Sequence, residues 1–129
     1  MDFEDYMSVS EEGVIISAAP TLVESDGGRN VFGYYFCIEN LSQNRIKIVG
    51  KNWNIADDMG NRFTDDSVGF KGEIPELEPG EFFEFTSTAS LDASNAVFYG
   101  SCKIASDRGV KEVQMPTFSF ASRGRVSIN

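Results

Sequence analysis

The chain has 129 residues, enough for one domain with its own hydrophobic core and no disulfide support. It carries 11 basic and 20 acidic residues, a formal charge of -9, so its surface is expected to repel nucleic-acid phosphates and anionic membranes. It contains no histidine, which excludes Ser-His-Asp and Cys-His catalysis and histidine-based zinc sites. We therefore expect no nucleic-acid partner, no membrane partner and no hydrolase of the familiar types.

The two ends of the chain are expected to be loose tails, residues 1–12 and 123–129, around a single domain that occupies residues 1–129. The first tail is acidic and lacks the basic start and apolar run of a secretory signal. No window reaches the roughly 18 apolar residues that cross a bilayer, so we expect a cytoplasmic location. Arg123 and Arg125 in the second tail are the only hint of a basic patch.

Apolar residues recur at alternate positions in short runs, which is the pattern of β-strands. The first run covers residues 14–23 and is interrupted by Pro20. The second run, residues 32–39, is the clearest. Its inward face is expected to carry Phe32, Tyr34, Phe36 and Ile38.

The third run, residues 46–55, changes parity between Ile48 and Trp53, and Gly50 lies between them. A β-bulge at this glycine would explain the change, because one extra residue reverses the facing of all that follow. Residues 57–61 then have the composition of a tight hairpin turn.

The pattern lapses over residues 64–80, which we expect to be a loop, and resumes after it. Later runs cover residues 83–85, 97–104 and 113–120. Seven or eight short antiparallel strands without helices predict an all-β sandwich or barrel.

The same parity predicts two free thiols. Cys37 is opposite to its apolar neighbours Phe36 and Ile38 and should face away from the core, whereas Cys102 shares a face with Phe98 and Ile104 and should face inward. Side chains on opposite faces do not meet the geometry of a disulfide.

Residues 31–121 resemble the ApaG domain family through several short motifs in the family's order. These are Ile38-Glu39-Asn40, Lys51-Asn52-Trp53-Asn54-Ile55, Gly69-Phe70-Lys71-Gly72-Glu73-Ile74-Pro75, Leu77-Glu78-Pro79-Gly80-Glu81-Phe82, Phe85-Thr86-Ser87, Gly100-Ser101 and Met115-Pro116-Thr117-Phe118. The first strand, residues 13–23, also fits the family's opening.

The resemblance implies an immunoglobulin- or fibronectin-III-like β-sandwich. It also implies a link to cobalt resistance and magnesium efflux, as in bacterial members, and protein binding, as inferred for eukaryotic members. No enzymatic activity is established for the family, so the resemblance implies no catalysis.

This chain departs from the family pattern at two places. It reads Lys51-Asn52-Trp53 where the family usually has Arg-His-Trp, so any role of that histidine is absent here. It also has Ser67 in place of the first glycine of the family's Gly-x-Gly-x-x-Gly loop.

Four residues of this loop, Ser67, Gly69, Lys71 and Gly72, form a candidate phosphate, nucleotide or divalent-cation site. Such loops bind phosphate when they lead into a helix whose N-terminal amides face the ligand. Here Pro75 follows, so no helix can begin, and acidic residues surround the loop. The alternative is that the glycines adopt turn conformations that other residues avoid.

Two further features have both a functional and a structural interpretation. Asp57, Asp58 and Asn61 offer oxygen ligands to a hard cation, but these residue types are also expected in a hairpin turn. Trp53 could be an exposed recognition platform, but a single Trp on a sandwich strand is usually a core anchor.

Taken together, the sequence predicts a binding module without a cofactor that recognises another protein. The candidate contact surface comprises Tyr35, Cys37 and Phe70, together with the loop of residues 64–80. Tyr35 could instead simply cover a neighbouring strand. A homodimer formed through an unprotected strand edge is left open.

Overall fold

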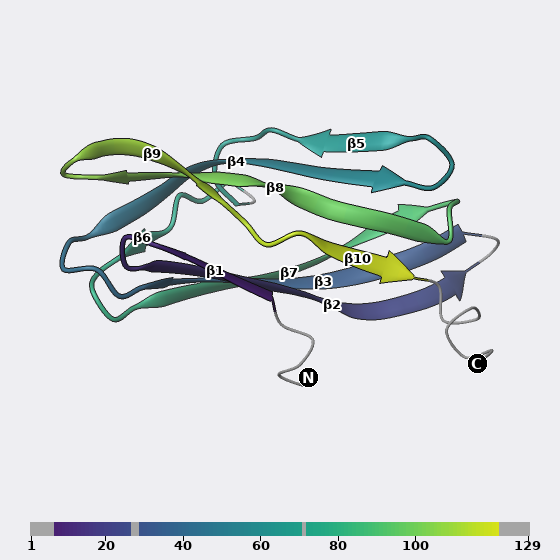
Figure 1. Cartoon of the computed structure of the whole chain (residues 1–129), viewed down its shortest axis with the longest axis horizontal. Helices are drawn as coiled ribbons and strands as arrows, with labels where there is room; N and C mark the ends of the chain where they lie inside the picture. The colour runs from purple at the N-terminus through teal and green to yellow at the C-terminus, as the bar shows by residue number, and fades with distance from the viewer. Residues whose placement is uncertain (1–6, 27–28, 71, 122–129) are drawn as a thin grey trace.

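Two antiparallel β-sheets pack face to face in the computed structural model, which describes residues 7–26, 29–70 and 72–121. Figure 1 shows one layer containing β4, β5, β8 and β9 above a second layer containing β1, β2, β3 and β7. The described residues contain no helix, and hence none that could span a membrane. The predicted all-β sandwich is confirmed.

The first sheet has four strands in the order β1-β2-β3-β7. They are β1 (Met7–Glu11), β2 (Val14–Asp26), β3 (Arg29–Asn40) and β7 (Phe82–Leu91). The second sheet has the order β10-β8-β4-β5, with β6 added to β4 and β9 added to β8. Its strands are β4 (Ile46–Asp57), β5 (Arg62–Asp65), β6 (Glu76–Leu77), β8 (Asn95–Ser106), β9 (Gly109–Gln114) and β10 (Phe118–Ala121).

Ten strands are present among the described residues, more than the seven or eight that alternation indicated. β1 lies in the segment expected to be a tail, β6 lies in the stretch where alternation lapses, and β5 ends in that stretch. The prediction that residues 1–12 form a loose tail is wrong for β1. Glu12 and Gly13 both have positive φ, 52° and 86°, and this tight turn folds β1 back along β2. The second predicted tail, residues 123–129, lies outside the described residues.

Pro20 does not end the first run. β2 continues through it with a register shift between Pro20 and Leu22 against β3. The pairing of β1 with β2 stops at Ala18, so no bond to β1 is lost where proline lacks an N–H group.

The predicted bulge in β4 is confirmed, because its register against β8 shifts between Ile48 and Gly50. After the shift, Lys51 and Trp53 are both buried. The predicted turn after β4 is also confirmed: Asp57 Oδ1 accepts the backbone N–H groups of Met59 and Asn61 at 3.0 and 2.9 Å. The Asp57 carboxylate therefore stabilises the turn, which agrees with the interpretation of this segment as a hairpin turn.

Trp53 is a core residue, only 3% exposed, with its ring centroid 4.8 Å from that of Phe36 and 5.5 Å from that of Phe98. The thiol prediction is confirmed as well: Cys102 is buried, Cys37 is half-buried, and both are free. Burial raises the pKa of Cys102 to about 12, so this thiol stays protonated at neutral pH.

Candidate functional site

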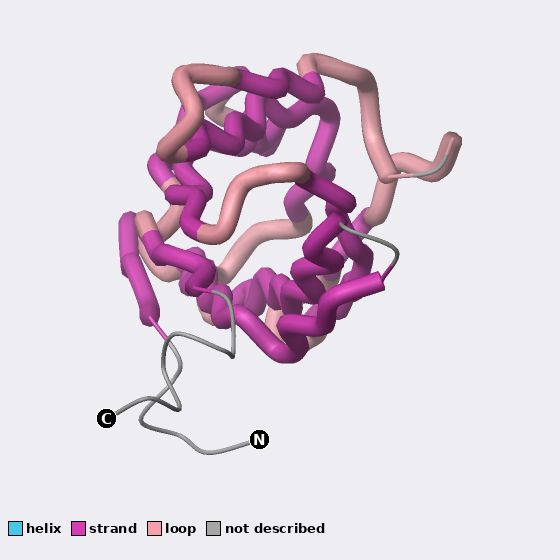
Figure 2. The backbone as a smooth tube through the Cα atoms, turned by 90° about the vertical axis from the view of Figure 1, so that its right-hand side faces the viewer, coloured by secondary structure: helices cyan, strands magenta, loops and turns pink. Residues whose placement is uncertain are grey.

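Residues 62–70 and 72–77 form one interrupted strand at the edge of β4 that faces away from β8. β5 pairs with the far half of β4, and β6 pairs with Ile46 and Lys47 at its start. Between them, the backbone N–H of Lys51 donates to Ser67 O at 3.3 Å and that of Ile48 donates to Pro75 O at 3.0 Å. Residues 66–70 and 72–75, called the glycine loop below, leave the sheet between these contacts and project from the side of the sandwich (Figure 2).

The buried side chain of Lys51 holds the glycine loop from beneath. Its Nζ donates to Ser67 Oγ at 2.9 Å and to Gly69 O at 2.5 Å, and lies 3.6 Å from Asp65 Oδ2. The same ammonium lies 4.7 Å from the ring centroid of Phe70, within range of a cation–π interaction. A buried lysine needs such partners, so the loop and the lysine stabilise each other. This anchor depends on the bulge, which turns Lys51 inward.

Asp65 at the base of the loop is the anionic partner of Lys51. Partial burial acts to raise the pKa of Asp65, but hydrogen bonds from Ser67 and the positive charge of Lys51 outweigh it and lower the pKa. A lowered pKa in the folded state stabilises the fold at pH values above the unfolded pKa. That contribution is lost as the pH falls through the folded value.

Two backbone hydrogen bonds link Phe70 and Glu73 across the glycine loop. Phe70 N–H donates to Glu73 O at 2.7 Å and Glu73 N–H donates to Phe70 O at 3.0 Å. Ser67 N–H donates to Asp65 Oδ1 at 3.1 Å. The amides of Ser67 and Phe70, which a phosphate would need, are therefore already engaged.

Both glycines in the loop have positive φ, 69° at Gly69 and 87° at Gly72, as expected if they adopt turn conformations that other residues avoid. At Gly69 a Cβ atom would lie 2.2 Å from Glu73 O, whereas at Gly72 it would meet nothing within 4 Å. The turn itself thus requires glycine at position 69. Lys71, the remaining member of the predicted ligand site, lies outside the described residues.

The predicted contact residues Tyr35, Cys37 and Phe70 do not share one surface. The prediction that Phe70 is available for contact is wrong, because its side chain is 3% exposed and packs on Phe83 and Phe85 of β7. Although Phe70 belongs to a loop, its ring packs into the hydrophobic core against Phe36 and Trp53. Tyr35 and Cys37 are half-buried on the outer face of β3, opposite to the face that carries Phe36.

Tyr35 covers the neighbouring strand, since its hydroxyl donates to Glu84 Oε2 on β7 at 2.8 Å. Burial and this hydrogen bond raise the pKa of Tyr35, so the hydroxyl remains a donor across the ordinary pH range.

Three of the eight exposed large apolar side chains among the described residues lie on the interrupted strand. Val68 is 68% exposed, Ile74 is 47% exposed and Phe63 of β5 is 47% exposed. Val68 and Ile74 lie in the predicted loop of residues 64–80 and Phe63 lies just before it, but none of the three was predicted as a contact residue. Their only signal is that they are large apolar residues in an otherwise polar segment.

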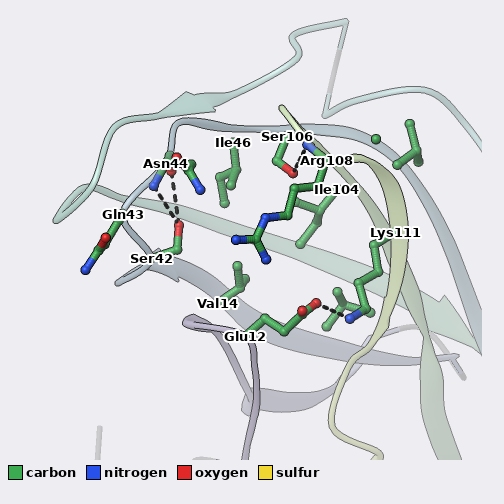
Figure 3. A pocket seen from close by; sticks show the side chains of 13 residues that line it. Glu12, Val14, Ser42, Gln43, Asn44, Ile46, Ile104, Ser106, Arg108 and Lys111 are labelled. Atoms are coloured by element: carbon green, nitrogen blue, oxygen red, sulfur yellow. Dashed lines mark hydrogen bonds and ion pairs between the residues drawn. The ribbon is translucent and has the colours of Figure 1, made fainter.

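A second concave feature, called the end cavity below, opens between the sheets at one end of the sandwich and has a volume of about 680 Å³ (Figure 3). It lies where the β1–β2 turn, the β3–β4 loop and the β8–β9 hairpin meet. Its floor is apolar: Val14, Ile46, Ile104 and Val113. Sequence reasoning missed it because its walls come from three separate segments.

The rim of the end cavity is charged. Glu12 and Lys111 form an ion pair across it, and Arg108 extends into the opening (Figure 3). The hydrogen bond from Lys111 and its charge are the main causes that lower the pKa of Glu12, and the charge of Arg108 adds to them. Across the part of the chain that is described, no three Cys, Asp or Glu side chains gather as a metal site would require.

Comparisons with known proteins agree with this architecture. A family model described as the ApaG domain matches residues 20–106. The chain is similar to Protein ApaG of Rhizobium leguminosarum bv. trifolii, with 31% identity over 106 residues, covering 81% of this chain and 82% of that protein. It is also similar to Protein ApaG of Parvibaculum lavamentivorans, with 32% identity over 120 residues, covering 89% and 92%.

Two solved structures share the fold. The X-ray structure of Northeast Structural Genomics Consortium target SoR45 superposes with a TM-score of 0.80 at 23% identity, covering 90% of this chain and 92% of that one. The putative ApaA protein from Bordetella pertussis superposes with a TM-score of 0.74 at 25% identity, covering 92% and 95%. The family match and the relatives, which extend over most of the chain, establish that this protein belongs to the ApaG domain family.

Proposed function

We propose that this chain is a non-catalytic binding module that recognises another protein through the glycine loop and the adjoining β5. The observation that carries the proposal is the exposure of Phe63, Val68 and Ile74 on a segment whose backbone is fixed by Lys51. A contiguous exposed apolar patch rimmed by polar residues is typical of a protein contact site, and we propose that these three side chains form one such patch.

A fixed loop favours such a role for an energetic reason. Binding is weakened by the entropy lost when flexible segments become ordered. The Phe70–Glu73 hydrogen bonds and the Lys51 contacts hold this loop in one conformation before a partner arrives. The apolar side chains are therefore presented without a large ordering penalty.

The charges around the loop indicate what kind of partner fits. Asp66, Glu73 and Glu76 are exposed beside the apolar residues, and the whole chain carries a formal charge of -9. A partner with a basic rim around an apolar centre would be attracted at long range and would match the loop on contact.

The alternative function, a phosphate, nucleotide or divalent-cation site in the same loop, has less support. Ser67 Oγ and Gly69 O accept hydrogen bonds from Lys51, and the amide of Phe70 is engaged by Glu73. Any link to cobalt or magnesium homeostasis would then act through the protein partner rather than through a metal held by this loop. A cytoplasmic location stays a prediction.

The test uses a variant that changes the loop surface without touching its anchor. Val68→Glu with Ile74→Glu places two charges on the proposed contact, and Phe82→Glu is the control, because Phe82 is 58% exposed but lies on β7 in the other sheet. Proteins captured from a lysate by immobilised wild-type chain and by the control should be absent with the double variant. The same captured proteins with a folded double variant would contradict the proposal.

Sedimentation of the three proteins separates a homodimer from a foreign partner. If the wild-type chain sediments as a dimer and the double variant as a monomer, the loop contacts a second copy of the chain, and the proposed foreign partner is wrong.

A further inference from the structure

We propose that the end cavity binds an organic carboxylate, with Arg108 holding the carboxylate group and the apolar floor holding an aliphatic body. This inference concerns a site remote from the glycine loop in the sequence and does not depend on the function proposed above.

Arg108 is the first reason. Its side chain reaches from the β8–β9 hairpin into the opening of the cavity (Figure 3). Its backbone N–H donates to Ser106 Oγ at 3.2 Å, but among the described residues its guanidinium has no hydrogen bond or ion pair. A guanidinium presents N–H donors in a planar fork that matches the two oxygens of a carboxylate.

The charge balance of the rim is the second reason. The described lining contains two cations, Arg108 and Lys111, and one anion, Glu12. Glu12 is already paired with Lys111, so one positive charge is left over for a ligand. A local positive charge is unusual on a chain with a formal charge of -9, and it favours a singly charged anion over a cation.

The size and floor of the cavity are the third reason. Its volume of about 680 Å³ is in the range of small-molecule sites, roughly 300–1,000 Å³. Val14, Ile46, Ile104 and Val113 are each at most 6% exposed and form an apolar base below the arginine. An inorganic anion is too small to touch this base, whereas an aliphatic chain would make van der Waals contact with it.

The ligand chemistry is thus one carboxylate on an apolar body. A free aliphatic acid and the C-terminal carboxylate of a peptide that ends in an aliphatic residue both have this chemistry. Nucleotides and diphosphates fit less well, because they bring two or more negative charges to one unpaired cation.

The experiment titrates the full chain, labelled with ¹⁵N, with octanoate, octanol and octylamine, and records amide chemical shifts. Octanoate should bind saturably and shift residues 42–46 and 104–113, octanol should bind more weakly at the same residues, and octylamine should not bind there. Acetate and inorganic phosphate should cause no saturable shifts. A short peptide ending in leucine, as free acid and as amide, distinguishes a peptide source from a free acid.

Arg108→Gln is the decisive variant, and Arg62→Gln is its matched control, because Arg62 lies on β5 outside the cavity. Losing a charge-assisted contact should weaken octanoate binding about tenfold or more in Arg108→Gln and leave octanol binding unchanged. Arg62→Gln should bind octanoate as the wild type does.

Three results would overturn the proposal: octanoate and octanol binding equally well, Arg108→Gln keeping wild-type affinity, or no saturable shift at the cavity. The variant with Val68→Glu and Ile74→Glu should retain octanoate binding. Failure of the carboxylate site and failure of the protein-recognition surface are therefore distinguishable.

Discussion

Replacing each glycine of the loop by alanine tests whether the loop is a fixed structure. Gly69 and Gly72 both have positive φ, and both substitutions carry the strain of an L-residue in that conformation, about 1 kcal/mol. They differ in the space around the new methyl group. At Gly72 this space is open, whereas at Gly69 the methyl would lie 2.2 Å from Glu73 O.

The magnitude of the difference follows from what must move. To relieve the clash, Glu73 has to shift away from position 69, which breaks the two backbone hydrogen bonds between Phe70 and Glu73, worth about 1 kcal/mol each. Gly69→Ala should therefore lower the free energy of unfolding by about 3 kcal/mol and Gly72→Ala by about 1 kcal/mol. For a chain of this size, about 4 °C in Tm corresponds to 1 kcal/mol.

Thermal unfolding followed by circular dichroism measures both variants against the wild type. We expect Tm to fall by about 12 °C for Gly69→Ala and by about 4 °C for Gly72→Ala. Equal decreases would refute the reasoning. They would mean that the loop rearranges freely around position 69, so that Lys51 does not hold it in one conformation.

Three further predictions concern the core, the thiols and the loop as a ligand site. Trp53→Ala should lower the free energy of unfolding by about 3–5 kcal/mol in chemical denaturation, because it removes the ring at the centre of the aromatic core. A variant as stable as the wild type would place Trp53 outside that core. Alkylation of the native protein at pH 8, measured by intact mass, should modify Cys37 slowly and Cys102 not at all. The reason is that burial raises the pKa of both thiols, that of Cys102 to about 12. Both thiols should react once the protein is unfolded. Thermal melting with nucleoside triphosphates, diphosphates, magnesium, cobalt or calcium should leave Tm unchanged, whereas a rise of several degrees that Gly72→Val abolishes would make the glycine loop a ligand site.

Lys51 connects the family pattern to the conformation of the loop. The resemblance suggested only that this position is usually arginine in the family and that its neighbour Asn52 replaces a histidine. In the structure the cation at position 51 is the group on which the loop rests, through Ser67 and Gly69. Ser67, which replaces a family glycine, supplies one of these hydrogen bonds with its side chain.

Local sequence alone predicted the longer strands and the facing of their residues, but it did not predict β1 or β6. Alternation placed Phe36 and Cys102 inward and Cys37 outward, and the change of parity indicated a bulge between Ile48 and Trp53. The structure confirms these predictions and places the bulge between Ile48 and Gly50. Such predictions succeed because side-chain direction in a strand depends only on local backbone geometry, which repeats every two residues.

Contacts between segments that are distant in the sequence could not be predicted and follow from the packing of the two sheets. No local pattern shows that Lys51 lies beneath a loop that starts 15 or more residues later, because the burial of a charge depends on partners distant in the sequence. Phe70 was predicted to be accessible because it lies in a loop, but its ring is buried between the two sheets. The end cavity needs Glu12, Ile46 and Arg108 together, and only the packing of the two sheets brings these three residues to one end of the sandwich.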